Sequence, residues 1–164
     1  PEADIPFEQL QDPYGIAFWP NFKGRDGCRT PMPWRGVERG GFSEASPWLP
    51  VPPEHLPLSV EAQQATADSP LQRFRRFMDF RRGQPALRWG AVRMLATAEP
   101  VLAFEREFEG ERLLCVFNLS AEAQTLALDE AQGAQALDGH GLVGGALREG
   151  RVELPGYGTV FARL

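Results

Sequence analysis

The pattern of hydrophobic and polar positions changes twice along this chain of 164 residues. No helical or strand period runs through residues 1–57, where glycine and proline recur too often for either. Apolar residues then recur at helical spacing up to about residue 84, and from about residue 90 the period becomes two. The pattern predicts a long loop segment, then a helical segment, then a β-rich segment.

The helical segment contains one strongly marked helix. Ser69 suits the N-cap of this helix, and Pro70 suits its first helical position. Gly83 can close the helix in a left-handed conformation. At helical spacing, one face carries the apolar residues Leu71, Phe74, Phe77 and Met78. A shorter helix is expected over about 60–66, with Ser59 as its cap.

The β-rich segment opens with a predicted hairpin. Residues 101–108 alternate between two sides, and Glu109-Gly110 makes a tight turn into a second arm over 111–119. That second arm is apolar on both faces, which is typical of a central, covered strand. Shorter strands are expected near 124–128, 134–137, 146–148, 151–154 and 157–163. So many short strands in sequence order predict an antiparallel sandwich.

The first 57 residues differ in composition from the rest. They hold 11 of the 15 prolines and three of the four tryptophans. A segment this long without periodic structure usually serves a site or packs against another surface, and exposed aromatic residues favour the second. We expect this segment to lean on a partner surface, either another part of the same protein or another chain.

The charge of the chain limits its partners. A net charge of −5 argues against nucleic acid and against an anionic membrane surface as partners. The longest apolar runs are far shorter than the roughly 20 residues of a membrane span. Cys28 and Cys115 have no metal-ligand or redox spacing, so we expect free thiols and a cytoplasmic location. The opening residues, Pro1-Glu2-Ala3-Asp4, lack a methionine, and we expect a piece of a longer polypeptide.

Residues 23–34, here called the arginine loop, carry the most distinctive chemistry. Two arginines, an aspartate and a tryptophan stand among glycines and prolines in the sequence KGRDGCRTPMPW. A guanidinium group can donate several hydrogen bonds in a fixed plane, and an indole offers a flat apolar face. This combination suits recognition of a polyhydroxylated or anionic ligand. The alternative is a structural loop, in which Arg25 and Asp26 only tie the loop to its neighbours.

The run GRDGCRTPMPW resembles a signature of the α-glucosidase branch of the α-amylase superfamily, glycoside hydrolase family 13, with oligo-1,6-glucosidases as examples. Three further motifs stand in that family's order: DPYGIAFWP, GGFSEASPWLPV and SPLQRFRRFMDFRRGQPALRWG. The resemblance is strong over residues 12–50 and weak after 95. One departure is Pro33, where many members carry glutamine.

The resemblance implies an α+β fragment of a longer enzyme. Residues 1–84 are expected to be the C-terminal end of a TIM-type (β/α)8 catalytic barrel, namely the loop after strand eight and helix eight. Residues 85–164 are expected to form the antiparallel β-sandwich domain that follows the barrel. No barrel strand is expected within this chain.

The resemblance also implies which residues bind substrate. The family's nucleophilic aspartate, acid/base glutamate and third essential aspartate lie on earlier barrel strands, so no catalytic residue is expected here. In relatives, the arginine equivalent to Arg29 hydrogen-bonds the terminal glucose. Arg25 and Asp26 match the same motif and are further candidates, with a loop-shaping role as the alternative, because Asp beside Gly commonly bonds turn backbone.

Other polar residues have plainer interpretations. His55 and His140 lie in turn-like contexts, which favours a surface position for both. Glu105, Glu107, Glu109 and Glu111 flank the hairpin turn at alternate positions, which favours a solvated strand face over a metal cluster. Trp34 could stack on a sugar or pack under the loop. We expect neither a metal ion nor a cofactor.

Two classes of function follow. The first is the C-terminal part of a retaining, exo-acting α-glucosidase that hydrolyses, and can transfer, terminal α-linked glucose. Its partners would be an α-glucoside or oligosaccharide and the remainder of the catalytic barrel. The alternatives are a non-catalytic, sugar-binding or structural β-module, and a related enzyme that isomerises sucrose or maltose.

Overall fold

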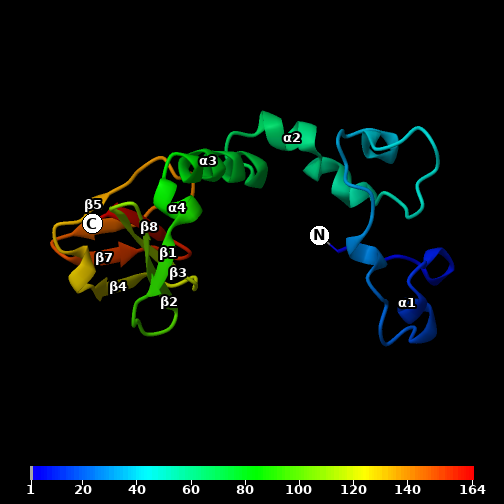
Figure 1. Cartoon of the computed structure of the whole chain (residues 1–164). Coiled ribbons are helices and arrows are strands. Elements are labelled where there is room, and N and C mark those ends of the chain that lie inside the picture. The colour runs from blue at the N-terminus through cyan, green and yellow to red at the C-terminus, as the bar shows by residue number, and fades with distance from the viewer. Residues whose placement is uncertain (1) are drawn as a thin grey trace. The chain divides into compact units, whose positions relative to one another are not determined.

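The computed structural model (Figure 1) describes residues 2–164, and the chain divides in sequence into two compact units, one ending at Gln72 and the other beginning at Arg73. This division falls inside a continuous helix, so it does not mark a domain boundary. The boundary expected after residue 84 therefore stays a prediction.

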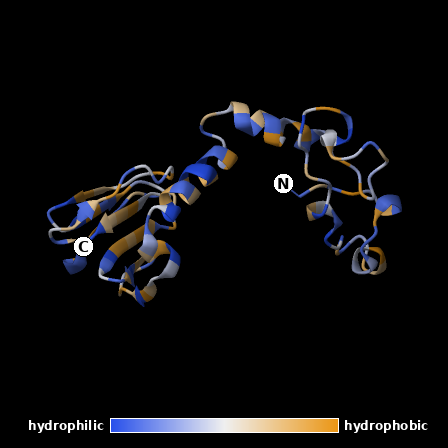
Figure 2. Ribbon diagram, turned by 45° about the horizontal axis from the view of Figure 1, so that its top comes forward, coloured by the Kyte–Doolittle hydropathy of each residue, from blue (hydrophilic) through white to orange (hydrophobic). Residues whose placement is uncertain are grey.

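The first unit is built from loops and short helical turns, and its described residues contain no strand. Its elements are η1 (Phe7–Gln9), α1 (Pro13–Ala17), η2 (Asp26–Cys28), η3 (Glu38–Gly41), η4 (Pro53–Leu58) and α2 (Val60–Ala65). Its one cluster of buried apolar residues consists of Ala3, Ile5 and Leu10. Figure 2 shows hydrophobic stretches alternating with hydrophilic ones along the loops of this unit. The unit therefore buries little apolar surface of its own.

The two expected helices form where their caps predict them. In α2, the Ser59 hydroxyl accepts a hydrogen bond from the Ala62 N–H at 3.4 Å. Helix α3 (Pro70–Arg82) follows Ser69, whose hydroxyl accepts from the Gln72 N–H at 3.3 Å. The left-handed closure expected at Gly83 is wrong, because its φ is not positive. No helix in the part of the chain that the structure describes has the length and apolarity to span a bilayer.

The second unit contains all eight strands of the described chain, in two antiparallel sheets. The larger sheet has the order β1-β2-β3-β8-β5 and the smaller one β4-β7-β6. The strands are β1 (Ala91–Met94), β2 (Val101–Phe108), β3 (Glu111–Asn118), β4 (Gln124–Ala127), β5 (Gln135–Ala136), β6 (Ala146–Arg148), β7 (Arg151–Leu154) and β8 (Thr159–Arg163). A short helix, α4 (Pro85–Trp89), precedes β1, and the turn η5 (Asp129–Ala131) follows β4. The predicted strands and the hairpin are confirmed.

Both faces of the larger sheet are covered, which explains why its strands are apolar on both sides. Between the two sheets lies a core that includes Leu114, Val116, Val152, Leu154 and Val160. The opposite face carries Leu113, Cys115 and Phe161, against which residues of α3 and α4 pack. The second unit therefore has three layers, helix on sheet on sheet, where the sequence predicted a sandwich alone.

The packing face of α3 differs in part from the prediction. Phe77 and Phe80 contact the second core, and the ring of Phe80 lies 5.1 Å from that of Phe161. Phe74, expected on the same face, has 61% of its surface exposed. The α3 side chains that contact the sheet are Phe77 and Phe80. The packing face of the helix is therefore rotated away from Phe74.

Candidate functional site

Two segments of the first unit come together at the arginine loop. Asp12 begins α1, where its Oδ1 accepts the Tyr14 N–H at 3.0 Å and Pro13 occupies the first helical position. A Cβ on Gly15 would lie 2.6 Å from the Lys23 carbonyl oxygen, and one on Gly24 would lie 2.9 Å from the Asp12 Cβ. Glycine at both positions therefore allows the start of α1 to lie directly against the loop.

Asp26 fastens the loop to the chain that precedes α1. Its side chain is fully buried, and Oδ2 accepts the backbone N–H groups of Gln11 at 2.6 Å and Asp12 at 2.7 Å. Its Oδ1 is buried with no hydrogen-bond partner among the described residues. These contacts match the alternative, loop-shaping role of Asp26, although they reach a distant segment instead of the adjacent turn. Sugar binding by Asp26 stays a prediction.

Asp12 is the point at which both arginines meet. Its Oδ2 accepts the backbone N–H of Arg25 at 3.0 Å and lies 3.6 Å from Nη1 of Arg29 and 3.9 Å from Nε of Arg25. Backbone hydrogen bonds from Arg25 and Tyr14, with the two positive charges, lower the pKa of Asp12, although burial opposes them. The lowered pKa keeps the Asp12 carboxylate ionised at neutral pH, although its side chain is only 4% exposed.

The two guanidinium groups remain accessible. The side chain of Arg29 is 43% exposed and that of Arg25 is 66% exposed. In the described residues, the Arg29 side chain makes no hydrogen bond, because its approach to Asp12 is longer than hydrogen-bond range. Its five N–H donors are therefore available to a ligand with several oxygen atoms.

Trp34 closes the arginine loop and is half exposed, at 50%. Its backbone is fixed, because its N–H donates to the Gly40 carbonyl at 2.7 Å and its own carbonyl accepts from Glu61 at 3.0 Å. The indole is thus not packed under the loop within this chain, and it keeps a free face. Stacking on a sugar remains compatible with this geometry.

Both histidines are buried, and the expectation of surface positions is wrong. His55 is 5% exposed and lies in η4, where its Nε2 has no hydrogen-bond partner in the described residues. His140 is 8% exposed, and its Nδ1 accepts the Leu142 N–H at 3.1 Å. Burial lowers the pKa of His140, although Asp138 opposes the shift. The sequence around His140 does form turns, but its ring packs against Phe80 and Phe161.

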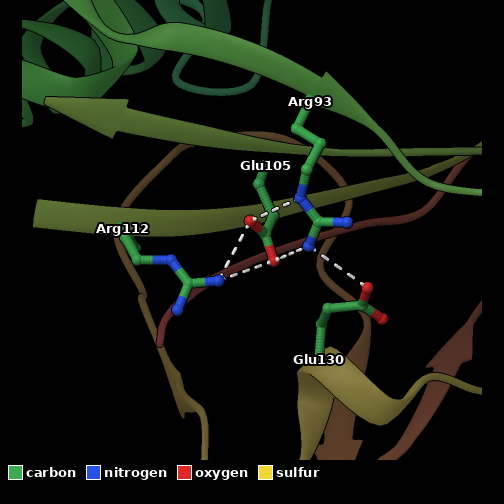
Figure 3. Close-up of polar contacts among 4 residues, drawn as sticks. All are labelled: Arg93, Glu105, Arg112 and Glu130. Atoms are coloured by element: carbon green, nitrogen blue, oxygen red, sulfur yellow. Dashed lines mark hydrogen bonds and ion pairs between the residues drawn. The ribbon is translucent and has the colours of Figure 1, made fainter.

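Glu105 is also buried, which corrects the expected solvated strand face. It lies on β2, where it accepts from Arg93 Nη2 at 2.7 Å and from Arg112 Nη2 at 3.1 Å (Figure 3). Arg93 extends the cluster to Glu130 at 3.3 Å. The cluster pairs carboxylates with arginines, and no group of His, Cys, Asp or Glu within residues 2–164 is arranged to hold a metal ion. Glu105 is therefore part of an ion-pair network.

Comparisons with known protein families divide the chain between two models. The catalytic domain of α-amylase matches residues 3–90, and the C-terminal domain of maltogenic amylase matches residues 92–160. The first match contains the arginine loop together with α1, α2, α3 and α4. The second contains the strands of both sheets, except for the first residue of β1 and most of β8.

Individual relatives match almost the whole chain. A probable α-glucosidase of Rhizobium meliloti is 47% identical over 99% of this chain and 29% of its own length. A glucan 1,6-α-glucosidase of Streptococcus pneumoniae is 32% identical over 78% of this chain and 23% of its own. The crystal structure of an α-glucosyl transfer enzyme, XgtA, is 48% identical with a TM-score of 0.91, over 99% of this chain and 30% of that one.

These matches share one feature, which is that the chain spans only about 30% or less of the length of each relative. They follow the order that the motifs predict, with a part of a catalytic domain followed by an antiparallel β-sheet domain. Because the catalytic-domain model matches more than half of the residues, the chain belongs to the α-amylase family.

Proposed function

We propose that this chain is the C-terminal part of a retaining, exo-acting α-glucosidase, in which the arginine loop contributes Arg29 to the binding of a terminal α-linked glucose. The observation that carries this proposal is the arrangement of Arg29. Its guanidinium group is 43% exposed, faces a buried carboxylate, and has its hydrogen-bond donors free among the described residues. Such a group can bond several sugar hydroxyls at once.

The catalytic carboxylates belong to the rest of the enzyme under this proposal. Retaining glycosidases need a nucleophile and an acid/base about 5–5.5 Å apart, and we assign neither role within this chain. The first unit exposes many large apolar side chains, including Phe18, Phe22, Trp34 and Trp48. The remainder of the catalytic barrel would cover such a surface, which supports its role as the partner of this unit.

Transfer of glucose is a second candidate, favoured by one observation. The α-glucosyl transfer enzyme XgtA is as similar to this chain as the probable α-glucosidase, at 48% against 47% identity. Hydrolysis and transfer differ in whether water or another hydroxyl receives the glucosyl group. Residues outside this chain could make that choice.

The cysteines bear on where the enzyme works. Cys28 is exposed and Cys115 is buried, and both are free. Burial raises the pKa of the Cys115 thiol to about 12, so this thiol stays protonated and unreactive. An exposed free thiol is most stable in a reducing compartment, and we propose a cytoplasmic location on this ground.

The test compares two proteins with an aryl α-glucoside as substrate. The full-length protein should release the aryl group and give the α-anomer of glucose first, as observed by NMR, because retention follows from double displacement. The chain of residues 1–164 alone should be inactive. Adding a sugar acceptor should reveal transfer products if the second candidate holds. Inversion of configuration, or turnover by the isolated chain, would contradict the proposal.

A further inference from the structure

Asp12 has the contacts of a residue that orients Arg29. It is a nearly buried carboxylate within 4 Å of two guanidinium groups, both of them far more exposed than Asp12 itself. Its two oxygens are divided between different tasks. As the N-cap of α1, Asp12 accepts the Tyr14 N–H with Oδ1, whereas its Oδ2 faces the Arg25 N–H, the Arg25 side chain and the Arg29 side chain.

We propose that Asp12 is a positioning residue for substrate binding, whose carboxylate fixes the direction of the Arg29 guanidinium group. This inference rests on the proposed function of Arg29. A long arginine side chain loses considerable rotamer freedom when it is fixed on a ligand. The fixed negative charge of Asp12 restricts the positions of the Arg29 guanidinium group before the ligand binds. Less side-chain freedom is therefore lost on binding.

The surroundings of Asp12 hold its carboxylate in place. Asp26 accepts the Asp12 N–H at 2.7 Å, and this bond fixes the backbone from which the Asp12 side chain extends. Gly24 has a φ of +72° and lies so close that a Cβ there would meet the Asp12 side chain. A positioning residue needs support of this kind, because a loosely held carboxylate could not define the direction of an arginine.

A simpler alternative is that Asp12 only caps α1. The two roles separate on substitution by asparagine, because Asn is about as good an N-cap as Asp but carries no charge. Asp12→Asn can keep the hydrogen bond to the Tyr14 N–H, but it loses both the attraction to Arg29 and the acceptor for the Arg25 N–H, and the melting temperature reports the effect of the second loss on the loop. A cap alone would leave substrate binding unchanged in this variant.

The experiment is a double-mutant cycle in the full-length protein, with kcat/KM for an aryl α-glucoside and the melting temperature as readouts. The variants are Asp12→Asn, Arg29→Ala and the double variant. Asp4→Asn is the matched control, because Asp4 is also paired with a loop residue, Lys23, but is 77% exposed. We expect Asp12→Asn to lower kcat/KM about 10-fold or more, and the control to leave it unchanged.

The decisive result is the double variant. If Asp12 acts through Arg29, the double variant should lose no more than about twofold beyond Arg29→Ala alone, because the two changes remove one interaction. Losses that multiply, or wild-type activity of Asp12→Asn beside an impaired Arg29→Ala, would overturn the positioning role alone. Wild-type activity of Arg29→Ala would overturn the proposed function and this inference with it. If Asp12→Asn fails to fold, Asp12→Ser replaces it in the same cycle, since serine also caps a helix without charge.

Discussion

Glu105 shows how a single buried carboxylate can link three neighbouring strands of one sheet. It lies on β2, and its side chain is 5% exposed, whereas its partners Arg93 on β1 and Arg112 on β3 are about half exposed. The charges of both arginines are therefore partly screened by water. The network stabilises the fold mainly because the buried carboxylate is satisfied.

Replacing Glu105 by alanine should lower the free energy of unfolding by about 1.5–3 kcal/mol, the range for hydrogen bonds to charged groups. A larger loss, as for a fully buried pair, is not expected, because Arg93 and Arg112 can be rehydrated. Glu107→Ala is the matched control on the same strand, since Glu107 is exposed and should change stability by no more than about 0.5 kcal/mol. Urea unfolding of the chain measures both. Equal effects at the two positions would contradict the account.

The contribution of Glu105 should also depend on pH. Burial acts to raise the pKa of Glu105, but hydrogen bonds from Arg93 and Arg112 together outweigh it and hold this pKa below the ordinary value of 4.5. The stabilisation is then complete above pH 4.5 and is lost as the pH falls through the folded-state pKa. The stability difference between the wild type and Glu105→Gln should shrink in acid. A difference that grows in acid would have the wrong sign.

Sequence alternation locates Glu105 and Glu107 on the same side of their strand, and it cannot tell how far the covering layer extends. Glu105 is buried and bonded by Arg93 and Arg112, whereas Glu107, two residues nearer the end of β2, is exposed. The same reason explains the histidines. A turn-rich sequence predicts local backbone shape, but burial of His55 and His140 depends on contacts with distant residues.

At the scale of elements, the hairpin between β2 and β3 is the clearest case of local sequence setting local structure. Both turn residues have positive φ, 49° at Glu109 and 87° at Gly110, as a two-residue turn of this kind requires. The eight residue pairs of the register run from Val101 with Asn118 to Phe108 with Glu111. Caps at Ser59 and Ser69 are similarly local signals, and the structure confirms both.

Gly110→Ala should cost about 1–2 kcal/mol of unfolding free energy, because an L-residue is strained at its positive φ. Contacts with other parts of the chain play no part, since a Cβ at Gly110 would meet none of their atoms within 4 Å. Gly144 is the matched control, with equally open space and no positive φ, so Gly144→Ala should be nearly neutral. Thermal melting of the chain compares the two. A similar loss at both positions would show that the turn conformation is not the cause.

Other elements could not be read from periodicity. The arginine loop depends on Asp12 and Asp26, which are 14 residues apart and joined through backbone N–H groups. The residue before Pro13 does carry a local signal, because Asp followed by Pro is typical of a helix start. That signal predicts a cap at Asp12, but the approach of Arg29 to its second oxygen follows only from the fold.

At the scale of the whole molecule, the two units differ in how much apolar surface they bury. The second unit has two clusters of buried apolar residues, on both faces of its larger sheet. The first unit buries only a few small or aliphatic side chains, and it exposes aromatic residues such as Phe18, Trp34 and Trp48. The resemblance of the sequence predicts this division, since a piece of a larger domain should lack a core of its own.

Amide hydrogen exchange of residues 1–164 alone should therefore distinguish the units. The strands β2, β3 and β8 should exchange slowly, because they lie between two apolar layers. The arginine loop and the segment up to η4 should exchange much faster, because few apolar contacts hold them. Uniformly slow exchange would contradict this account and would indicate that the first unit is stable by itself or is covered by a second copy.

The central claim is that Arg29 binds substrate, and kinetics of its variants in the full-length protein test it most directly. Arg29→Ala should lower kcat/KM for an α-glucoside by roughly 10- to 200-fold, since a charged hydrogen bond contributes about 1.5–3 kcal/mol. Arg29→Lys should restore only part of the activity, because a point charge cannot replace a planar fork. Arg25→Ala should cause a smaller loss, since the Arg25 backbone N–H, which remains, makes its hydrogen bond to Asp12. An Arg29→Ala variant with wild-type kcat/KM would contradict the claim.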